Sequence, residues 1–159
     1  MESNTPPHSS CLIIDNDAIA ANFQNLAMRV APATCGAVVK ADGYGLGAAN
    51  VASALLHAGC RSFFVARLSE AERLRRTLGP GCDIMILNGL DPGSEATCSD
   101  AGFIPALNSS AQLAAWRACA RSAGRPLPAA VQVDTGMSRL GLSPEAALTA
   151  ARDPGFSEQ

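Results

Sequence analysis

The feature that most constrains this chain is a repeated alternation of short apolar segments with longer helical ones. The apolar segments are rich in β-forming residues and are the expected strands: 35–41, 62–66, 83–87, 103–107 and 129–134. Their starts lie roughly 20 to 27 residues apart, which is the spacing of a βα unit. Their hydrophobicity is nearly continuous rather than alternating, as in strands covered on both faces. The chain therefore predicts an α/β fold with parallel strands.

Several segments between the expected strands carry residues that begin or end helices. Two are capping boxes and two place a cap residue before proline: Ser69 with Glu72, Ser109 with Gln112, Asp91–Pro92 and Ser143–Pro144. Gly79–Pro80 is expected to end the helix that begins near Ser69. A further helix, led by Asp and Asn residues, follows residues 12–14 and is expected to end near Met28.

Strict alternation of strands and helices fits either a closed (β/α)8 barrel or an open doubly wound sheet. A barrel needs eight units and typically about 250 residues, whereas this chain has 159 residues and the pattern of about five units. The barrel interpretation therefore predicts a partial (β/α)8 TIM-type barrel with its C-terminal strands absent and two open sheet edges. We expect a disordered leader over residues 1–10 and the N-terminal part of the barrel over residues 11–159.

Composition excludes several classes of function. A net charge of −2 and the lack of a basic stripe argue against nucleic-acid binding. No segment resembles a membrane span or a signal peptide. Six cysteines without a close pair and only two histidines predict neither a metal site nor a disulfide scaffold. Reduced thiols in a cytoplasmic protein are the expected outcome.

Lysine is almost absent from the chain, which has eleven arginines and the single lysine Lys40. Lys40 lies at the carboxyl end of the first expected strand, where barrels carry their chemistry. Arginine cannot replace a nucleophilic amine, because guanidinium stays protonated. An amine whose pKa is lowered by burial forms Schiff bases with carbonyl compounds, including pyridoxal phosphate. The alternative is a structural lysine that pairs with a carboxylate.

A glycine-rich turn follows Lys40 and leads into the expected helix from Ala48. Gly43, Gly45 and Gly47 allow the backbone to approach a ligand closely, and the following helix start can face an anion. Tight turns also use glycine for steric reasons alone, so this turn by itself does not identify a ligand.

Two segments resemble those of a known family. The segment from Val38 to Gly47, VVKADGYGLG, resembles the pyridoxal-phosphate attachment segment of alanine racemases. The segment from Val133 to Gly141, VDTGMSRLG, resembles the family's segment at the end of the fifth barrel strand. The resemblance implies a pyridoxal-5′-phosphate-dependent isomerase that interconverts L- and D-alanine. It also implies a cytoplasmic homodimer that supplies D-alanine for the cell wall.

The resemblance assigns roles to three residues. Lys40 would hold the cofactor as an internal aldimine and act as acid or base on one face of the substrate Cα. Tyr44 would bind the cofactor phosphate, and Arg139 would bind the phenolic oxygen and the substrate carboxylate. Asp134 is expected to shape its turn. The alternatives are a purely structural Tyr44 and an Arg139 that forms a salt bridge with Asp134 or Glu145.

Two departures from the family pattern qualify these roles. Gln132 stands where the family often has a carbamylated lysine that pairs with the arginine. The family's second catalytic group is a tyrosine from the C-terminal β-domain of the partner subunit, and further cofactor contacts come from later barrel strands. The chain contains none of these parts, so we expect that residues 1–159 alone do not racemise alanine.

Three other functions remain open at this point. One is a pyridoxal-phosphate-binding barrel without catalytic activity, although such proteins lack the second motif. Another is a racemase of serine or of several amino acids, which shares both motifs. The third is a nucleotide-binding doubly wound domain, in which Lys40 would have no catalytic role.

Overall fold

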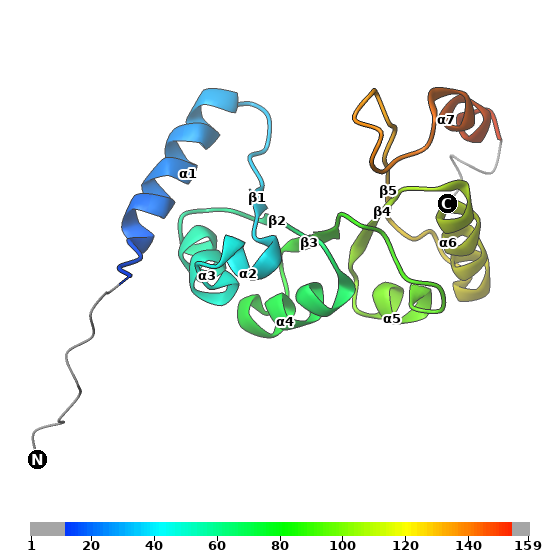
Figure 1. Cartoon of the computed structure of the whole chain (residues 1–159). Helices are drawn as coiled ribbons and strands as arrows, with labels where there is room; N and C mark the ends of the chain where they lie inside the picture. The colour runs from blue at the N-terminus through cyan, green and yellow to red at the C-terminus, as the bar shows by residue number, and fades with distance from the viewer. Residues whose placement is uncertain (1–11, 154–159) are drawn as a thin grey trace, which may run out of the picture.

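The computed structural model of the chain describes residues 12–153. Its strands are β1 (Ala37–Val38), β2 (Ser62–Val65), β3 (Asp83–Ile86), β4 (Ile104–Leu107) and β5 (Ala130–Val131) (Figure 1). Its helices are α1 (Asn16–Val30), α2 (Lys40–Tyr44), α3 (Ala48–His57), α4 (Leu68–Leu78), α5 (Glu95–Asp100), α6 (Ser110–Ala123) and α7 (Pro144–Ala151). The predicted leader, residues 1–10, lies outside the described residues.

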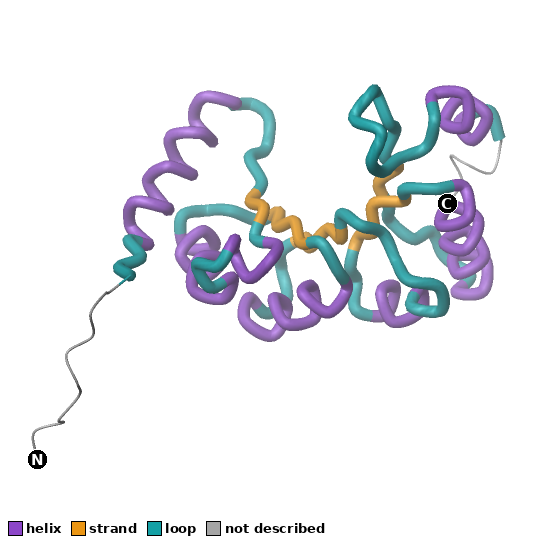
Figure 2. The backbone as a smooth tube through the Cα atoms, viewed as in Figure 1, coloured by secondary structure: helices purple, strands orange, loops and turns teal. Residues whose placement is uncertain are grey.

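The five strands form one parallel sheet whose spatial order repeats the chain order, β1-β2-β3-β4-β5. Figure 2 shows these strands following an arc. A doubly wound sheet reverses its strand order at a switch point, whereas here each strand is added on the same side of the one before. The sheet is therefore part of a barrel wall, which confirms the predicted partial (β/α)8 barrel and contradicts the doubly wound alternative.

The outer, convex side of the sheet carries the main core. Helices α3 to α6 lie along this side in Figure 1. Alternate strand residues point toward them, and Phe63, Val65, Ile84 and Ile86 are almost fully buried there. These residues fix the strands against the helices that follow them.

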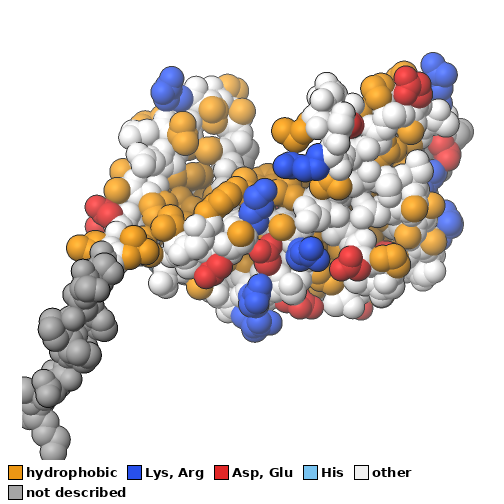
Figure 3. All heavy atoms as spheres, viewed as in Figure 1, with side chains coloured by type: hydrophobic (Ala, Val, Ile, Leu, Met, Phe, Trp, Pro, Cys, Tyr) orange, Lys and Arg blue, Asp and Glu red, His pale blue; other side chains and the backbone are white. Residues whose placement is uncertain are grey.

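The concave side of the sheet is less covered within residues 12–153. Phe64 and Met85 are half-buried, and Val38 is 44% exposed. Figure 3 shows hydrophobic side chains along the hollow above the strands. The sequence predicted cover on both faces, but β2 and β3 are fully buried only on the outer face, whereas β4 has buried residues on both faces. The physical reason is that the inner face of a barrel is buried by its other strands.

Two of the predicted helix starts are confirmed. Ser109 caps α6 by accepting a hydrogen bond from the Gln112 amide at 3.2 Å. Ser143 caps α7 by accepting one from the Ala146 amide at 3.2 Å, with Pro144 at the first helical position. The helix predicted to end near Met28 is α1, which ends at Val30.

Two other predicted starts are wrong. The helix α4 begins at Leu68, so Ser69 lies inside it and does not cap it with Glu72. The helix α5 begins only at Glu95, after Ser94, so Asp91–Pro92 belongs to the preceding turn. The N-cap residues are instead Arg67 and Ser94, and neither side chain makes a cap hydrogen bond. Local patterns allow several helix starts within one turn.

The first and last strands of the sheet each have one unpaired side. Among residues 12–153, β1 and β5 each pair with one strand only, so both edges are unpaired there.

The described cysteines are free thiols: Cys35, Cys60, Cys82, Cys98 and Cys119. None of the helices between residues 12 and 153 combines the length and apolar character that crossing a bilayer requires.

Candidate active site

Lys40 lies directly beyond the first strand, as the sequence predicted. The Val39 amide donates to the Phe64 carbonyl at 2.9 Å, so pairing with β2 continues one residue past β1. Val39 is 2% exposed, whereas Lys40 is half-buried. The chain therefore leaves the sheet at Lys40, on the side of the sheet where the carboxyl ends of the parallel strands lie.

The short segment α2, which begins at Lys40, is a left-handed turn rather than a regular α-helix. Ala41, Asp42 and Tyr44 have φ values of 52°, 54° and 57°. The conformation costs about 1–2 kcal/mol at Ala41 and at Tyr44, whereas aspartate adopts it more readily. Gly43 lies between them with φ 64°, and a Cβ there would be 3.2 Å from the backbone of Ala48. The glycine is therefore required both for its φ and for close packing against α3.

Glu70, the third residue of α4, holds this turn to its neighbour. One carboxylate oxygen accepts from the Ala41 amide at 2.8 Å. The other accepts from the Ala66 and Arg67 amides at 2.7 and 3.1 Å. Sequence reasoning missed this residue: a glutamate three residues after Arg67 is a local signal for a cap, but the partner at Ala41 is 29 residues away.

Asp42 links the turn to α3. Its Oδ1 accepts a hydrogen bond from the Ala48 amide at 2.9 Å, so this first helical amide already has an anionic partner. The expectation that this helix start faces a ligand anion is thus not met at Ala48. Tyr44 is 64% exposed, which leaves its hydroxyl accessible.

The second motif forms a loop after β5 that Asp134 organises. Its Oδ1 accepts from the Gly136 amide at 2.9 Å and from the Ser138 amide at 3.0 Å. These hydrogen bonds, that of Ser138 first, hold the pKa of the Asp134 carboxyl below its usual value, because they stabilise the charged form. Asp134 therefore holds the backbone of this loop in its turn by accepting hydrogen bonds from it.

The base of the same loop is closed by backbone pairing. The Leu142 amide donates to the Gln132 carbonyl, and the Asp134 amide donates to the Leu142 carbonyl, both at 2.8 Å. Gly141 has φ 116°, and a Cβ there would be 2.7 Å from the Asp134 nitrogen. A larger residue at Gly141 would therefore force the two sides of the loop apart.

Arg139 is exposed in this loop, and the described residues show no salt bridge from it to Asp134 or Glu145. Gln132, which replaces the family's lysine, donates from Nε2 to the Leu140 carbonyl at 3.1 Å. It thus holds the backbone beside Arg139, and no hydrogen bond joins the two side chains in this part of the structure.

The hydrogen bonds of Asp134 predict a pH effect confined to this loop. A lowered pKa means that the bonds are fully formed above the usual aspartate value of about 3.9 and are lost as the pH falls through the lower, folded value. We expect the NMR amide shifts of Gly136 and Ser138 to titrate together, with a midpoint below that of a free aspartate. D134N should remove this titration. A midpoint at or above the usual value would contradict the proposed role of these bonds.

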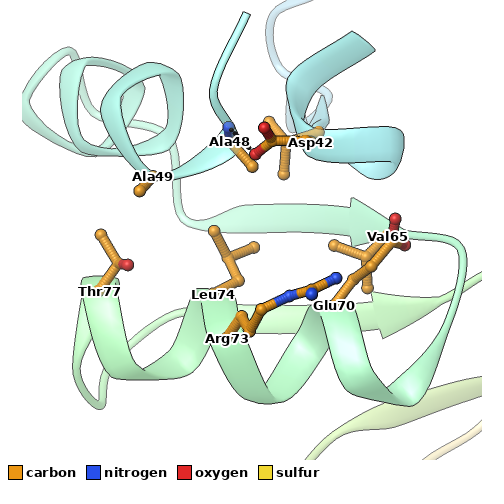
Figure 4. A pocket seen from close by; sticks show the side chains of 9 residues that line it. Asp42, Ala48, Ala49, Val65, Glu70, Arg73, Leu74 and Thr77 are labelled. Atoms are coloured by element: carbon orange, nitrogen blue, oxygen red, sulfur yellow. Dashed lines mark hydrogen bonds between the residues drawn. The ribbon is translucent and has the colours of Figure 1, made fainter. Parts of the chain in front are cut away.

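A cavity of about 370 Å³ lies behind the Lys40 turn, between α3 and α4. Figure 4 shows Glu70, Arg73 and Thr77 on α4 facing Asp42, Ala48 and Ala49. None of Lys40, Tyr44 and Arg139 lines it. This cavity is therefore separate from the side chains that the sequence predicts to act on a substrate.

The fold brings the two motifs to the same end of the sheet, because parallel strands share their carboxyl edge. Lys40 and Tyr44 come from the turn after β1, and Arg139 comes from the loop after β5. The two strands are the outermost of the curved sheet. A primary amine, a phenol and a guanidinium are thus available at one edge, which suits a carbonyl compound with anionic groups.

Comparisons with known proteins agree with this arrangement. The family described as "Alanine racemase, N-terminal domain" matches residues 14–157. A catabolic alanine racemase of Mesorhizobium japonicum is 55% identical over 133 residues, which are 84% of this chain and 35% of the relative. An alanine racemase of Methylobacterium nodulans is 52% identical over 149 residues, 94% of this chain and 40% of the relative.

Solved structures give the same result for the fold. The alanine racemase of Bartonella henselae with covalently bound pyridoxal phosphate superposes with a TM-score of 0.87 at 43% identity, covering 91% of this chain and 40% of that protein. The alanine racemase from E. faecalis superposes with a TM-score of 0.79 at 34% identity, covering 87% of this chain and 38% of that protein. The chain thus spans about 35–40% of the length of these relatives. With the family match over most of its length and the shared barrel wall, the chain belongs to the alanine racemase N-terminal domain family.

Proposed function

We propose that residues 11–159 form the N-terminal barrel part of an alanine racemase that uses pyridoxal 5′-phosphate. The observation that carries the proposal is the position of Lys40: the chain's single lysine is half-buried at the carboxyl end of β1, beside a strained turn. Backbone strain of this kind clusters at functional sites. The relative from Bartonella henselae, whose structure contains covalently bound pyridoxal phosphate, has the same fold.

The residues present fit this cofactor. An aldehyde requires a primary amine, and Lys40 is the one lysine amine of the chain. A phosphate requires hydrogen-bond donors, and the exposed Tyr44 offers its hydroxyl four residues further on. Arg139 offers a planar guanidinium for a phenolate or a carboxylate. Lys40, Tyr44 and Arg139 are therefore the residues that we propose to hold the cofactor.

The chain's own residues would then carry one half of the reaction. When bound, pyridoxal phosphate supplies the electron sink that a side chain cannot provide. Lys40 would move a proton at Nζ on one face of the substrate Cα, and Arg139 would orient the substrate through its carboxylate. Racemisation needs a second acid–base group on the opposite face. We propose that it comes from outside residues 12–153, from the partner subunit of a homodimer, in line with the family resemblance.

We also propose a cytoplasmic location and a role in supplying D-alanine for the cell wall. The location is supported by the free thiols of Cys35, Cys60, Cys82, Cys98 and Cys119, because such thiols persist in a reducing compartment. The role is supported by the family resemblance and by the Methylobacterium nodulans relative, which is named simply an alanine racemase. The Mesorhizobium japonicum relative is named a catabolic alanine racemase, so alanine breakdown is the competing role.

A chimera tests the proposed activity. In it, this chain replaces the 149 matching residues of the Methylobacterium nodulans relative. We expect the purified chimera, with pyridoxal phosphate, to convert L-alanine to D-alanine, while the chain alone does not. Chiral chromatography of the products measures this, with L-serine as the competing substrate. Binding of the cofactor without turnover would instead support a non-catalytic barrel, and faster turnover of serine would support the broader racemase.

A further inference from the structure

We propose that Glu70 is a positioning residue for Lys40: its carboxylate ties the backbone immediately after the lysine to the end of the neighbouring strand. This inference rests on the proposed function, because it assigns Glu70 a part in presenting the Lys40 amine to an aldehyde. Glu70 does not touch the reacting atoms through any contact in the described structure. It acts through the Ala41 amide, which follows Lys40 directly.

The geometry makes Glu70 a bridge between two βα units. Its carboxylate accepts from the Ala41 amide at 2.8 Å on one side and from the Ala66 amide, just past β2, at 2.7 Å on the other. The Arg67 amide completes the set at 3.1 Å. All three partners are N–H donors, so an acceptor-only carboxylate matches them and a neutral amide cannot. Hydrogen bonds to a charged group are the stronger class.

The corresponding position on α6, two βα units further along the chain, carries Gln112 instead of a glutamate. The comparison shows that the residue type matches the donors and acceptors around it. Gln112 is the third residue of α6, as Glu70 is of α4. Its Oε1 accepts from the Asn108 amide at 2.8 Å, and its Nε2 donates to the Asn88 and Leu90 carbonyls at 3.4 and 3.3 Å. Here one partner is a donor and two are acceptors, which suits an amide. Both residues tie the turn after one strand to the end of the next.

The turn after Lys40 is strained, so a hydrogen bond that holds it in place has a larger effect there than at an unstrained turn. Ala41, Asp42 and Tyr44 adopt left-handed conformations that are unfavourable for side-chain-bearing residues. Strained segments persist only when surrounding contacts over-determine them. The bond from Glu70 fixes the first residue of this run and so fixes where the chain leaves β1. The direction of the Lys40 side chain depends on that exit.

The experiment uses the chimera described above, first freed of cofactor. E70Q keeps the shape of the side chain but replaces one acceptor oxygen by a donor, and Q112A is the matched control for loss of a bridge elsewhere. The readout is the rate at which added pyridoxal 5′-phosphate becomes attached to Lys40, trapped with borohydride and measured by peptide mass spectrometry. We expect E70Q to slow this attachment by at least about tenfold, and Q112A to leave it within about twofold of wild type.

Two further measurements separate a specific effect of E70Q on cofactor attachment from a general loss of stability and from failure of the proposed function. Thermal unfolding of both variants reports stability, and the unsubstituted chimera reports whether Lys40 takes up the cofactor at all. Attachment at an equal rate in E70Q and wild type, or equal slowing in E70Q and Q112A, would overturn the inference. In the unsubstituted protein, the Ala41 amide should exchange with deuterium as slowly as a hydrogen-bonded amide. Exchange at the rate of a free peptide would overturn it without any variant.

Discussion

Replacing Lys40 by arginine is expected to abolish covalent attachment of pyridoxal phosphate and to lower alanine racemisation by the chimera at least about 10³-fold. Arginine keeps the positive charge and the length of the side chain, but its guanidinium stays protonated and does not condense with an aldehyde. The measurements are the absorption of the bound cofactor, the mass of the borohydride-reduced protein and the rate of D-alanine formation.

The control for this experiment uses the scarcity of lysine in the chain. R121K places a new lysine at an exposed position in the last turn of α6, away from both motifs. We expect the reduced adduct to remain on Lys40 in R121K and the activity to stay near that of the unsubstituted chimera. Attachment that persists in K40R would show that another amine holds the cofactor, and the role proposed for Lys40 would be wrong.

Replacing Phe63 by alanine is expected to lower the free energy of unfolding by about 3–5 kcal/mol. Phe63 is fully buried in β2, between its paired neighbours Ala37 on β1 and Ile84 on β3, on the face covered by the helices. Its removal leaves a cavity that the surrounding strands cannot fill. Urea unfolding followed by far-ultraviolet circular dichroism, with the unsubstituted chain measured in parallel, gives the change.

Phe64→Ala is the matched control, because Phe64 is the next residue on the same strand and faces the concave side. It is only half-buried within the described structure. We expect its loss to cost at most about 2 kcal/mol, since less area leaves water on folding. An equal cost at the two positions would mean that the concave side is as well packed as the outer side, contrary to the burial described above.

The positions of the strands could be predicted from the sequence because their signals are local, but the first and last, expected over 35–41 and 129–134, are only Ala37–Val38 and Ala130–Val131. The second and third strands begin at Ser62 and Asp83, as the apolar segments indicate. Ser109 and Ser143 lie next to the helices that they cap, so a short pattern is sufficient to find them. The position of Lys40 at a strand end followed from the same local evidence.

The rest depended on contacts between distant parts of the chain. The bond from Glu70 to Ala41 spans 29 residues, and no pattern in either segment specifies it. The left-handed conformation of Ala41 and Tyr44 also runs against the preference of these residues. Such departures from local preference are most common at functional sites. Here they occur beside the residue to which the sequence assigned the chemistry.

The order of the strands has a consequence for how the polypeptide acquires its structure during synthesis. Within residues 12–153, each strand pairs with the one translated just before it, so none of these four pairings has to wait for a distant segment to emerge from the ribosome. Contacts of short sequence separation form quickly, because little loop entropy is lost in closing them. We therefore expect vectorial assembly, in which every newly exposed sheet edge becomes the template for the next βα unit.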